Sequence, residues 1–545
     1  MSGAARYVHT LRYLRPVQVF GRLWYQARRP RPDLRAAPAL RPLHSVYAQP
    51  IAPQATLIAR DRVRLLNVER RCATPADWHP PEASKLWIYH LHYFEDLNAR
   101  EADLRRDWHR EWLQRWVREN PPGLREAWEA YPLSRRIVNW IKWTLRGNEL
   151  PALCRESLAV QARWLAARVE HHILGNHLLV NAAALLHAGL YFDGVEPQRW
   201  FERGLTILTR ELREQVLADG GHFERSPMYH AAVLGDLLDL VNLCRAYGAA
   251  VPAEWPAVIA RMQAWLEAMT HPDGEIAFFN DAAWGVAPTA AQTAAYAGRL
   301  GVPAIPGDSA DLTMLDPSGY VRAQAGPAVL VCDCAPIGPD HLPAHAHADT
   351  LSFELSLHGQ RVLVNSGVSQ YGTDAERLRQ RGTAAHNTVV VDGQDSSEVW
   401  GGFRTARRAR VRRRSLRGPP PPLTIEAAHD GYRRLPGRSE HLRRWQLDAR
   451  TLQIEDHIAG PFRTAQAFFH LHPQFEVEQR ASGALQLTGP HMPAPLRMSF
   501  EGAAAVGVHP GTWHPGFGVA LANRRIVAHF AGPELITRLA WTGER

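Results

Sequence analysis

The sequence predicts an α+β chain in which a helical first part is followed by a separate β-rich part. With 545 residues, the chain is too long for one ordinary core. From about residue 60 to 310, apolar side chains recur with the 3.6-residue period of helices. After about residue 315 the period changes to two, as in strands. We therefore expect two segregated domains that meet near residues 310–320.

Residues 1–60 are predicted to form an Arg/Pro-rich extension, with an amphipathic helix near 5–28 and irregular chain after it. Residues 1–50 contain nine arginines against one acid, Asp33. Such a cluster is either solvated surface or a site that attracts a polyanion, such as an acidic sugar or the anionic lipids of a membrane.

A second basic run extends from Arg404 to Arg417, with eight arginines and no acid. The same two interpretations apply to it, solvated strands or a subsite for acidic groups. No nucleic-acid motif accompanies either run, so we expect no nucleic-acid partner.

Residues 61–315 are predicted to form the helical domain. The segment at 200–221 has leucines at helical spacing and ends on a pair of glycines. LLVNAAALLHAGLYF at 178–192 is apolar on nearly every side, which indicates a buried helix, and the segment at 230–248 is similar. Helix pairs of this kind pack as a ring or a solenoid.

Residues 316–545 are predicted to form an antiparallel β domain. In TLSFELSLHGQRVLVNSG at 350–367, apolar and polar residues alternate. Gly359-Gln360 then turns the chain back, which predicts a hairpin.

The five cysteines are scattered and odd in number, so we expect small buried hydrophobes and no disulfide framework. There is no run of about 18 apolar residues that would predict a membrane span. The first residues lack the apolar core of a signal peptide, which predicts a cytoplasmic protein and leaves the periplasm open.

Two polar clusters lie in the helical domain. The first, Asn176-His177, opens the buried helix, where polar side chains need partners. A helix cap with a hydrogen-bonded core histidine is the alternative interpretation. The second runs from Gly221 to His230 and includes Tyr229. Its glycine pair and Ser-Pro turn predict a loop, where functional groups concentrate.

A third cluster opens the β domain. In His341-Leu-Pro-Ala-His345-Ala-His347-Ala-Asp349, a strand would place His345, His347 and Asp349 on one face. Histidines grouped in this way favour metal binding or acid–base chemistry over a structural core. Metal-dependent hydrolases also use HxHxD strings, but in a different fold context. A zinc hydrolase is therefore the least favoured of three hypotheses.

The run HAHADTLSFELSLHGQRVLVNSGVSQYG at 345–372, with RQRGTAAHNTVVVDGQDSSEVW at 379–400, resembles the C-terminal module of the heparinase II/III-like polysaccharide lyases. Related alginate lyases share this architecture. GNHLLVNAAALLHAGLYF, HFERSPMYH and EAWEAYPLSRRIVNW resemble the family's helical module. The resemblance covers about residues 85–400. It implies an incomplete (α/α) toroid followed by an antiparallel β-sandwich.

The family's reaction is β-elimination at a uronic acid, in which the C5 proton is removed and the bond to the 4-oxygen breaks. By position in the motifs, Asn176 and His177 would neutralise the uronate carboxylate. Tyr229 matches the family's tyrosine acid/base and His345 its second base.

The resemblance implies further roles for residues beside these motifs. Arg136 and Glu224 are expected to support substrate binding. In some family members a structural zinc ion is held by histidine, aspartate and histidine. The matching positions are His347, Asn365 and His386. Asn365 departs from this pattern, because a neutral amide is a poorer zinc ligand than a carboxylate.

The leading hypothesis is a lyase for a uronic-acid-containing polysaccharide, linked to exopolysaccharide metabolism. The second is a non-catalytic protein of the same fold that binds acidic polysaccharide or assists assembly, docked on an anionic membrane through its Arg-rich first residues. The sequence leaves open the polymer, internal or terminal attack, recognition of sulfate and the oligomeric state.

Overall fold

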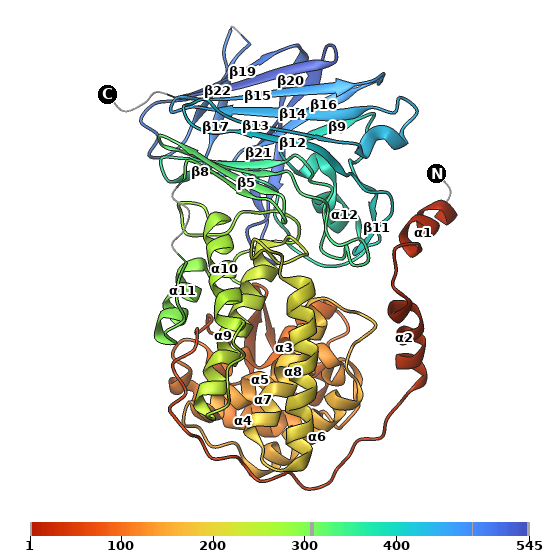
Figure 1. Cartoon of the computed structure of the whole chain (residues 1–545), viewed down its shortest axis with the longest axis vertical. Coiled ribbons are helices and arrows are strands. Elements are labelled where there is room, and N and C mark those ends of the chain that lie inside the picture. Colours follow the sequence, from red (N-terminus) through yellow and green to blue (C-terminus); the bar gives the residue numbers. More distant parts are fainter. Residues whose placement is uncertain (1–2, 306–309, 482, 542–545) are drawn as a thin grey trace.

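The computed structural model describes residues 3–305, 310–481 and 483–541. Figure 1 shows the helices packed at one end of the long axis and the sheets at the other. The helices of the first part are α3 (Lys85–Tyr93), α4 (Arg106–Glu119), α5 (Ala130–Leu145), α6 (Ala152–Ala167), α7 (Asn176–Tyr191), α8 (Val195–Gln215), α9 (Pro227–Ala246), α10 (Trp255–Ala268) and α11 (Ala290–Arg299).

Helix α7 is the centre of the helical part. It packs against α5, α6, α8 and α9, and every one of its residues except His177 is buried. This confirms the predicted buried helix and explains why its sequence is apolar on all sides. Two glycines allow α8 to approach closely. A Cβ on Gly189 would lie 2.6 Å from the backbone nitrogen of Phe201, and one on Gly204 would lie 2.9 Å from the Ala182 carbonyl oxygen.

Two features precede these helices. Helices α1 (Gly3–Leu11) and α2 (Pro16–Ala27) lie on one flank of the molecule, where a single amphipathic helix was expected (Figure 1). A small sheet then follows, with strands β1 (Leu57–Ala59), β2 (Arg62–Leu65) and β3 (Val68–Arg71). This sheet was not predicted, because each strand has only three or four residues.

The second part of the chain consists of antiparallel sheets. A five-stranded sheet has the order β4 (Leu312–Leu315), β5 (Tyr320–Ala325), β6 (Ala328–Asp333), β7 (Phe353–Leu357), β8 (Gln360–Leu363). An eight-stranded sheet has the order β12 (Val411–Arg417), β13 (Leu423–His429), β14 (Glu440–Leu447), β15 (Thr451–Ala459), β22 (Glu534–Ala540), β19 (Leu496–Glu501), β18 (Leu485–Thr488), β17 (Glu476–Gln479).

A four-stranded sheet has the order β20 (Ala503–Trp513), β21 (Leu521–Phe530), β16 (Ala465–His470), β9 (Val389–Val391). The short pair β10 (Val399–Trp400) and β11 (Arg404–Thr405) and helix α12 (Ala375–Arg381) lie beside the sheets. One apolar core joins the three larger sheets, with Phe353, Trp445 and Phe469 among its buried residues. Sheets that share a core in this way form a sandwich.

The hairpin predicted at Gly359-Gln360 is confirmed as β7 and β8. However, every residue of β7 is buried, including the polar residues that the alternating pattern places on one face. The helical part covers that face: the His271 ring contacts the Ser356 hydroxyl at 2.8 Å and the Glu354 carboxylate at 3.1 Å. The five cysteines are buried with free thiols, as predicted.

The prediction of a strand at His345–Asp349 is wrong. Residues 341–350 form an irregular loop, and strand β7 begins only at Phe353. Without strand alternation, His345 and His347 do not share a face. Within the described ranges, no helix has both the length and the apolar character that a membrane crossing requires.

The close packing of α7 and α8 can be tested with Gly189→Ala. The added methyl group meets backbone atoms that have little room to move, so we expect the free energy of unfolding in urea to fall by about 1–3 kcal/mol. The control is Gly298→Ala in α11, where a Cβ has no atom within 4 Å. That change should be neutral or stabilising by up to about 1 kcal/mol. Equal effects at both sites would contradict the packing argument.

Candidate active site

A cleft of about 520 Å³ lies where the helical part meets the sheets. Helices α3, α5, α7 and α9 line one side, and loops of the β part line the other. The four predicted catalytic residues, which come from three separate segments of the sequence, all line it: Asn176, His177, Tyr229 and His345.

Tyr229 lies in the first turn of α9. Ser226 caps this helix by accepting a hydrogen bond from the Tyr229 backbone amide at 3.2 Å. The Tyr229 ring stacks on His345 with 3.8 Å between ring centroids. Its hydroxyl lies 2.9 Å from the Tyr371 hydroxyl. Burial raises the pKa of Tyr229 well above 10, and Tyr371 adds to the effect. The phenol is therefore protonated at neutral pH and can donate a proton.

His345 is oriented by Glu224. Its Nδ1 is hydrogen-bonded to the buried Glu224 carboxylate. Burial alone would raise the pKa of Glu224, but its contact with His345 outweighs burial and lowers it. A carboxylate on Nδ1 favours the tautomer with its proton there, which leaves Nε2 as the basic nitrogen. Glu224 thus positions His345, where a substrate contact was expected.

Asn176 and His177 are the first two residues of α7. The Nδ1 of His177 lies 2.9 Å from the Glu170 carboxylate, and its ring packs beside Tyr131. Both residues stand at a helix N-terminus, whose unpaired backbone amides and partial positive charge favour an anion. This end of the cleft is suited to a carboxylate.

The expectation for Arg136 is corrected. Arg136 is fully buried outside the cleft. Its guanidinium donates to the Gln161 side chain and to the His92 and Ala127 carbonyl oxygens. Its neighbour Arg135 lines the cleft instead. Consecutive helical residues point about 100° apart, and Arg136 follows Leu133 on the buried stripe of α5. Helical phase could have identified Arg135.

The Arg135 guanidinium, which lines the cleft, is paired with two carboxyl groups. It donates to Asp236 at 2.8 Å and pairs with Glu95 at 3.5 Å. Burial opposes ionisation of Glu95, but His90 and Arg135 outweigh it and lower the pKa of Glu95 to about 2. Burial raises the pKa of Asp236.

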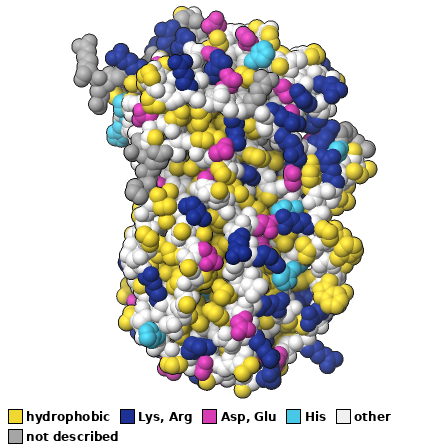
Figure 2. Space-filling model, viewed as in Figure 1, with side chains coloured by type: hydrophobic (Ala, Val, Ile, Leu, Met, Phe, Trp, Pro, Cys, Tyr) yellow, Lys and Arg dark blue, Asp and Glu magenta, His cyan; other side chains and the backbone are white. Residues whose placement is uncertain are grey.

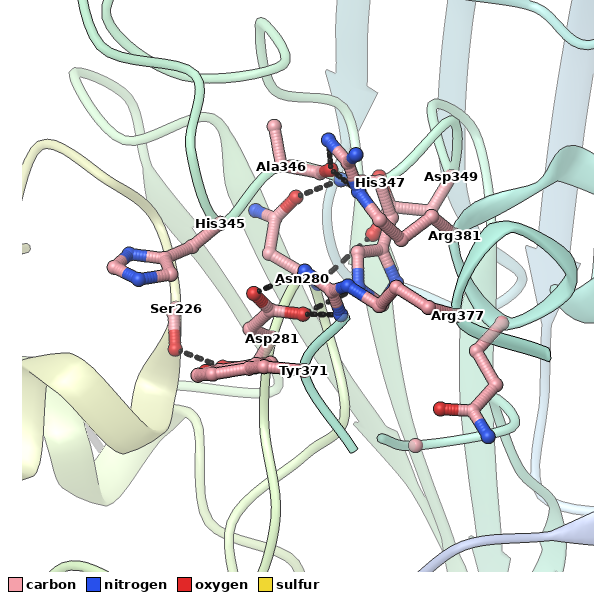
Figure 3. Close-up of polar contacts among 12 residues, drawn as sticks. Ser226, Asn280, Asp281, His345, Ala346, His347, Asp349, Tyr371, Arg377 and Arg381 are labelled. Atoms are coloured by element: carbon pink, nitrogen blue, oxygen red, sulfur yellow. Dashed lines mark hydrogen bonds and ion pairs between the residues drawn. The ribbon is translucent and has the colours of Figure 1, made fainter. Parts of the chain in front are cut away.

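An ion pair behind the cleft, which the sequence did not reveal, holds the His345 loop (Figure 3). Asp281 accepts two hydrogen bonds from the Arg377 guanidinium and one from His347 at 2.8 Å. Its backbone amide donates to the His345 carbonyl oxygen at 2.9 Å, and its carbonyl oxygen accepts from the Ser226 hydroxyl. All of these side chains except His345 are buried. An Asn-Asp pair at 280–281 within apolar FF…AAW was the only sequence signal.

The three positions considered for zinc, His347, Asn365 and His386, lie in this buried region. His347 Nδ1 and His386 Nε2 are 3.3 Å apart. The Asn365 amide donates to the Phe278 carbonyl at 2.8 Å and accepts from the Asn387 backbone at 3.2 Å. Burial lowers the pKa of His347 to about 4 and that of His386 to about 3, so both rings are neutral.

These residues fit zinc poorly, because the Asn365 amide is satisfied by backbone groups and supplies no negative charge. In the part of the chain that the structure describes, no group of three or more His, Cys, Asp or Glu side chains is arranged to hold a metal. Zinc therefore stays a prediction, and the chemistry below uses none.

The arginine run at 404–417 is largely engaged with acids. Arg407 pairs with Glu398, and Arg408 pairs with Asp340 at 2.7 Å. Other pairs in the run join Arg410 to Asp340, Arg412 to Asp430, and Arg414 to Asp316. This pairing favours the surface interpretation of the run over a subsite for acidic groups.

The fold defines the class. The chain superposes on the crystal structure of heparinase III with a TM-score of 0.69 at 18% identity, covering 86% of this chain and 79% of that one. It superposes on heparan sulfate lyase from Pedobacter heparinus with a TM-score of 0.59 at 19% identity, covering 97% and 88%. The predicted toroid followed by a β-sandwich is thus confirmed.

The sequence comparison then gives the family. Residues 88–297 match "Heparinase II/III N-terminus", and residues 307–542 match "Heparinase II/III-like, C-terminal". This chain belongs to the heparinase II/III-like family.

Two proteins with sequences similar to this chain have names that describe different properties. A heparin-sulfate lyase from Pedobacter heparinus is 27% identical over 333 residues, which is 52% of this chain and 48% of that protein. FtsZ-localized protein C from Caulobacter vibrioides is 27% identical over 388 residues, 64% of this chain and 63% of that protein. The chain spans about half the length of the Pedobacter lyase.

Replacing Asp281 with Asn tests the ion pair behind the cleft. Removing one partner of a buried pair leaves the Arg377 charge uncompensated, so we expect a loss of about 3–5 kcal/mol in the free energy of unfolding. Asp316→Asn at an exposed pair is the control and should change it by less than about 0.5 kcal/mol. An equally small effect of Asp281→Asn would show that the pair does not hold the loop.

The same pair predicts a pH dependence. Burial opposes ionisation of Asp281, but Arg377 and His347 outweigh it and lower its pKa well below the usual 3.8. The stability that this shift contributes is complete above pH 3.8 and is lost as the pH falls toward the folded-state pKa. Urea unfolding at a series of acidic pH values should show a shallower decline for Asp281→Asn than for wild type. Parallel curves would contradict this assignment.

Proposed function

We propose that this protein is a polysaccharide lyase that cleaves a uronic-acid-containing polysaccharide by β-elimination. The observation that supports this most strongly is the joint placement of Tyr229, His345 and Asn176 around one cleft. Family membership supports the reaction class, and the cleft geometry is consistent with a role for each group.

The proposed steps place the family's reaction on the residues of the cleft. The uronate carboxylate binds at the start of α7, where Asn176 and the helix N-terminus stabilise the charge that develops on it. Nε2 of His345 removes the C5 proton. The electron pair of the C5–H bond forms the C4=C5 double bond, and the bond from C4 to the leaving oxygen breaks. Tyr229 donates its phenolic proton to that oxygen.

The stacking of Tyr229 on His345 links the two proton transfers. A phenol with a raised pKa is a weak acid while the histidine is neutral. Once His345 has accepted the C5 proton, its positive charge lies against the Tyr229 ring and favours the phenolate. Glu224 stabilises the imidazolium on its other side. Tyr229 therefore becomes a stronger acid once His345 has taken the C5 proton.

The charge of the cleft favours a sparsely charged polymer. Its lining holds the cations Lys85 and Arg135 but also the carboxyl groups of Glu95, Asp236 and Glu224. The remaining surface is mainly aromatic and aliphatic. A chain with several sulfates per disaccharide would meet no matching set of cations. We propose an unsulfated uronate polymer, in contrast to the sulfated substrates in the names of the lyase relatives.

A second candidate is a non-catalytic protein that binds acidic polysaccharide or assists assembly. The relative named FtsZ-localized protein C matches a larger share of this chain than the heparin-sulfate lyases do, and its name describes a location without an activity. Intact placement of the predicted catalytic groups favours the lyase.

The first test is ultraviolet detection of unsaturated uronate product during incubation with a panel of acidic polysaccharides. Tyr229→Phe should reduce the rate by about 10²- to 10⁴-fold, because the proton donor is lost. Tyr247→Phe, which lies outside the cleft, should retain the wild-type rate. No product from any polymer, together with binding on the same panel, would favour the second candidate.

A second test compares unsulfated and sulfated polymers. If the cleft charge sets specificity, kcat/KM on an unsulfated uronan should exceed that on heparan sulfate by about tenfold or more. Substituting both Glu95 and Asp236 with the corresponding amides should narrow this ratio. A preference of the wild type for heparan sulfate would refute the substrate proposal while leaving the elimination intact.

A further inference from the structure

Helix α2 is turned with its apolar side outward. Its inner face is formed by Gln18, Gly21 and Tyr25: Gln18 donates to the His341 carbonyl at 3.0 Å, and the Tyr25 ring packs 4.3 Å from His172. A Cβ on Gly21 would lie 3.1 Å from the His172 Cβ.

The opposite face of α2 is apolar and exposed. Phe20 is 70% exposed, Leu23 60% and Trp24 64%. At 100° per residue, Phe20 and Leu23 point away from the Gln18–Tyr25 face. A surface helix of a globular protein ordinarily turns such a stripe toward the core, so this arrangement indicates a partner outside the chain.

Helix α1 extends the same surface. Its Tyr7 and Thr10 contact Trp400, whereas Val8 and Leu11 are 64% and 56% exposed. Figure 2 shows hydrophobic and basic side chains on the flank where α1 and α2 lie in Figure 1. We call Val8, Leu11, Phe20, Leu23 and Trp24 the outward apolar face.

Positive charge surrounds this face. Arg6, Arg22, Arg28 and Arg29 are exposed in and beside the two helices. Neither α1 nor α2 contains an acidic residue, and the first 50 residues contain only Asp33. Aromatic and leucine side chains on one face, flanked by arginines, are typical of helices that lie in the interface of an anionic bilayer. An ordinary protein partner would not require this excess of positive charge.

We propose that the outward apolar face docks this protein on the surface of a bilayer that contains anionic lipid. The helices lie in the headgroup region with Phe20, Leu23 and Trp24 inserted, and the arginines contact lipid phosphates. They do not cross the membrane. This interaction is independent of the lyase proposal and uses none of the residues of the cleft.

Vesicle sedimentation of the full chain tests the proposal. One set of vesicles contains phosphatidylcholine alone, and the other contains equal amounts of phosphatidylcholine and phosphatidylglycerol. We expect at least about tenfold tighter binding to the anionic vesicles, weakened by added salt. Absence of binding to the anionic vesicles, or equal binding to both sets, would overturn the proposal.

Paired variants separate the apolar from the electrostatic contribution. Phe20→Ser with Trp24→Ser should abolish binding, whereas Leu104→Ser with Val195→Ser, at exposed apolar positions elsewhere, should leave it unchanged.

For charge, Arg22→Gln with Arg28→Gln and Arg29→Gln should reduce binding to anionic vesicles at least about tenfold. Arg450→Gln with Arg463→Gln and Arg497→Gln, on the exposed surface of the β part, should not.

All four variants should keep the wild-type midpoint of thermal unfolding, because the altered side chains face solvent, which excludes misfolding as the cause of lost binding. Wild-type binding by the Phe20/Trp24 variant would overturn the proposal. So would a dimer in light scattering that the same variant dissociates while vesicles bind nothing, since the face would then join two copies of the chain.

Discussion

The buried ion pair between Asp281 and Arg377 is the interaction on which the cleft depends. It joins the end of the helical part, the loop that carries His345 and helix α12 of the β part. Because a charge buried without a partner is strongly unfavourable, separating Asp281 from Arg377 would be costly. Its Asp281 backbone also holds Ser226, the cap of α9, which places Tyr229. One residue therefore orients both groups to which we assign proton transfer.

A cleft at the junction of two parts suits the proposed elimination, because that reaction needs groups of different character. The helical part contributes a helix N-terminus with Asn176 and a tyrosine, both on rigid helices. The β part contributes His345 on a loop, braced from behind by hydrogen bonds. Preorganised donors of this kind need little rearrangement during the reaction. The carboxylate of Glu224, from the helical part, contacts His345 across the junction. The contact between Glu224 and His345 therefore forms only when the two parts are packed together.

Sequence reasoning succeeded where local pattern decides structure. The buried α7 and the β7–β8 hairpin follow from periodicity, and the residues lining the cleft were found because each lies in a short family-like motif. It failed where tertiary contacts decide. Alternating HAHAD looks like a strand, but its loop conformation is fixed by Asp281, Asn280 and Arg381 from elsewhere in the chain. Asp281 and Arg377 are 96 residues apart, so no local signal pairs them.

Helices α1 and α2 are a second case in which the sequence pattern alone does not decide the tertiary contacts. Periodicity showed that residues 5–28 are amphipathic, but amphipathicity alone does not say which face meets the protein. In α2 the inner contacts are made by an amide, a glycine and a tyrosine, while the larger apolar side chains face outward. Local hydrophobicity would place Phe20 and Trp24 inside. Both side chains remain largely exposed, so the free energy of burying them is available to a partner.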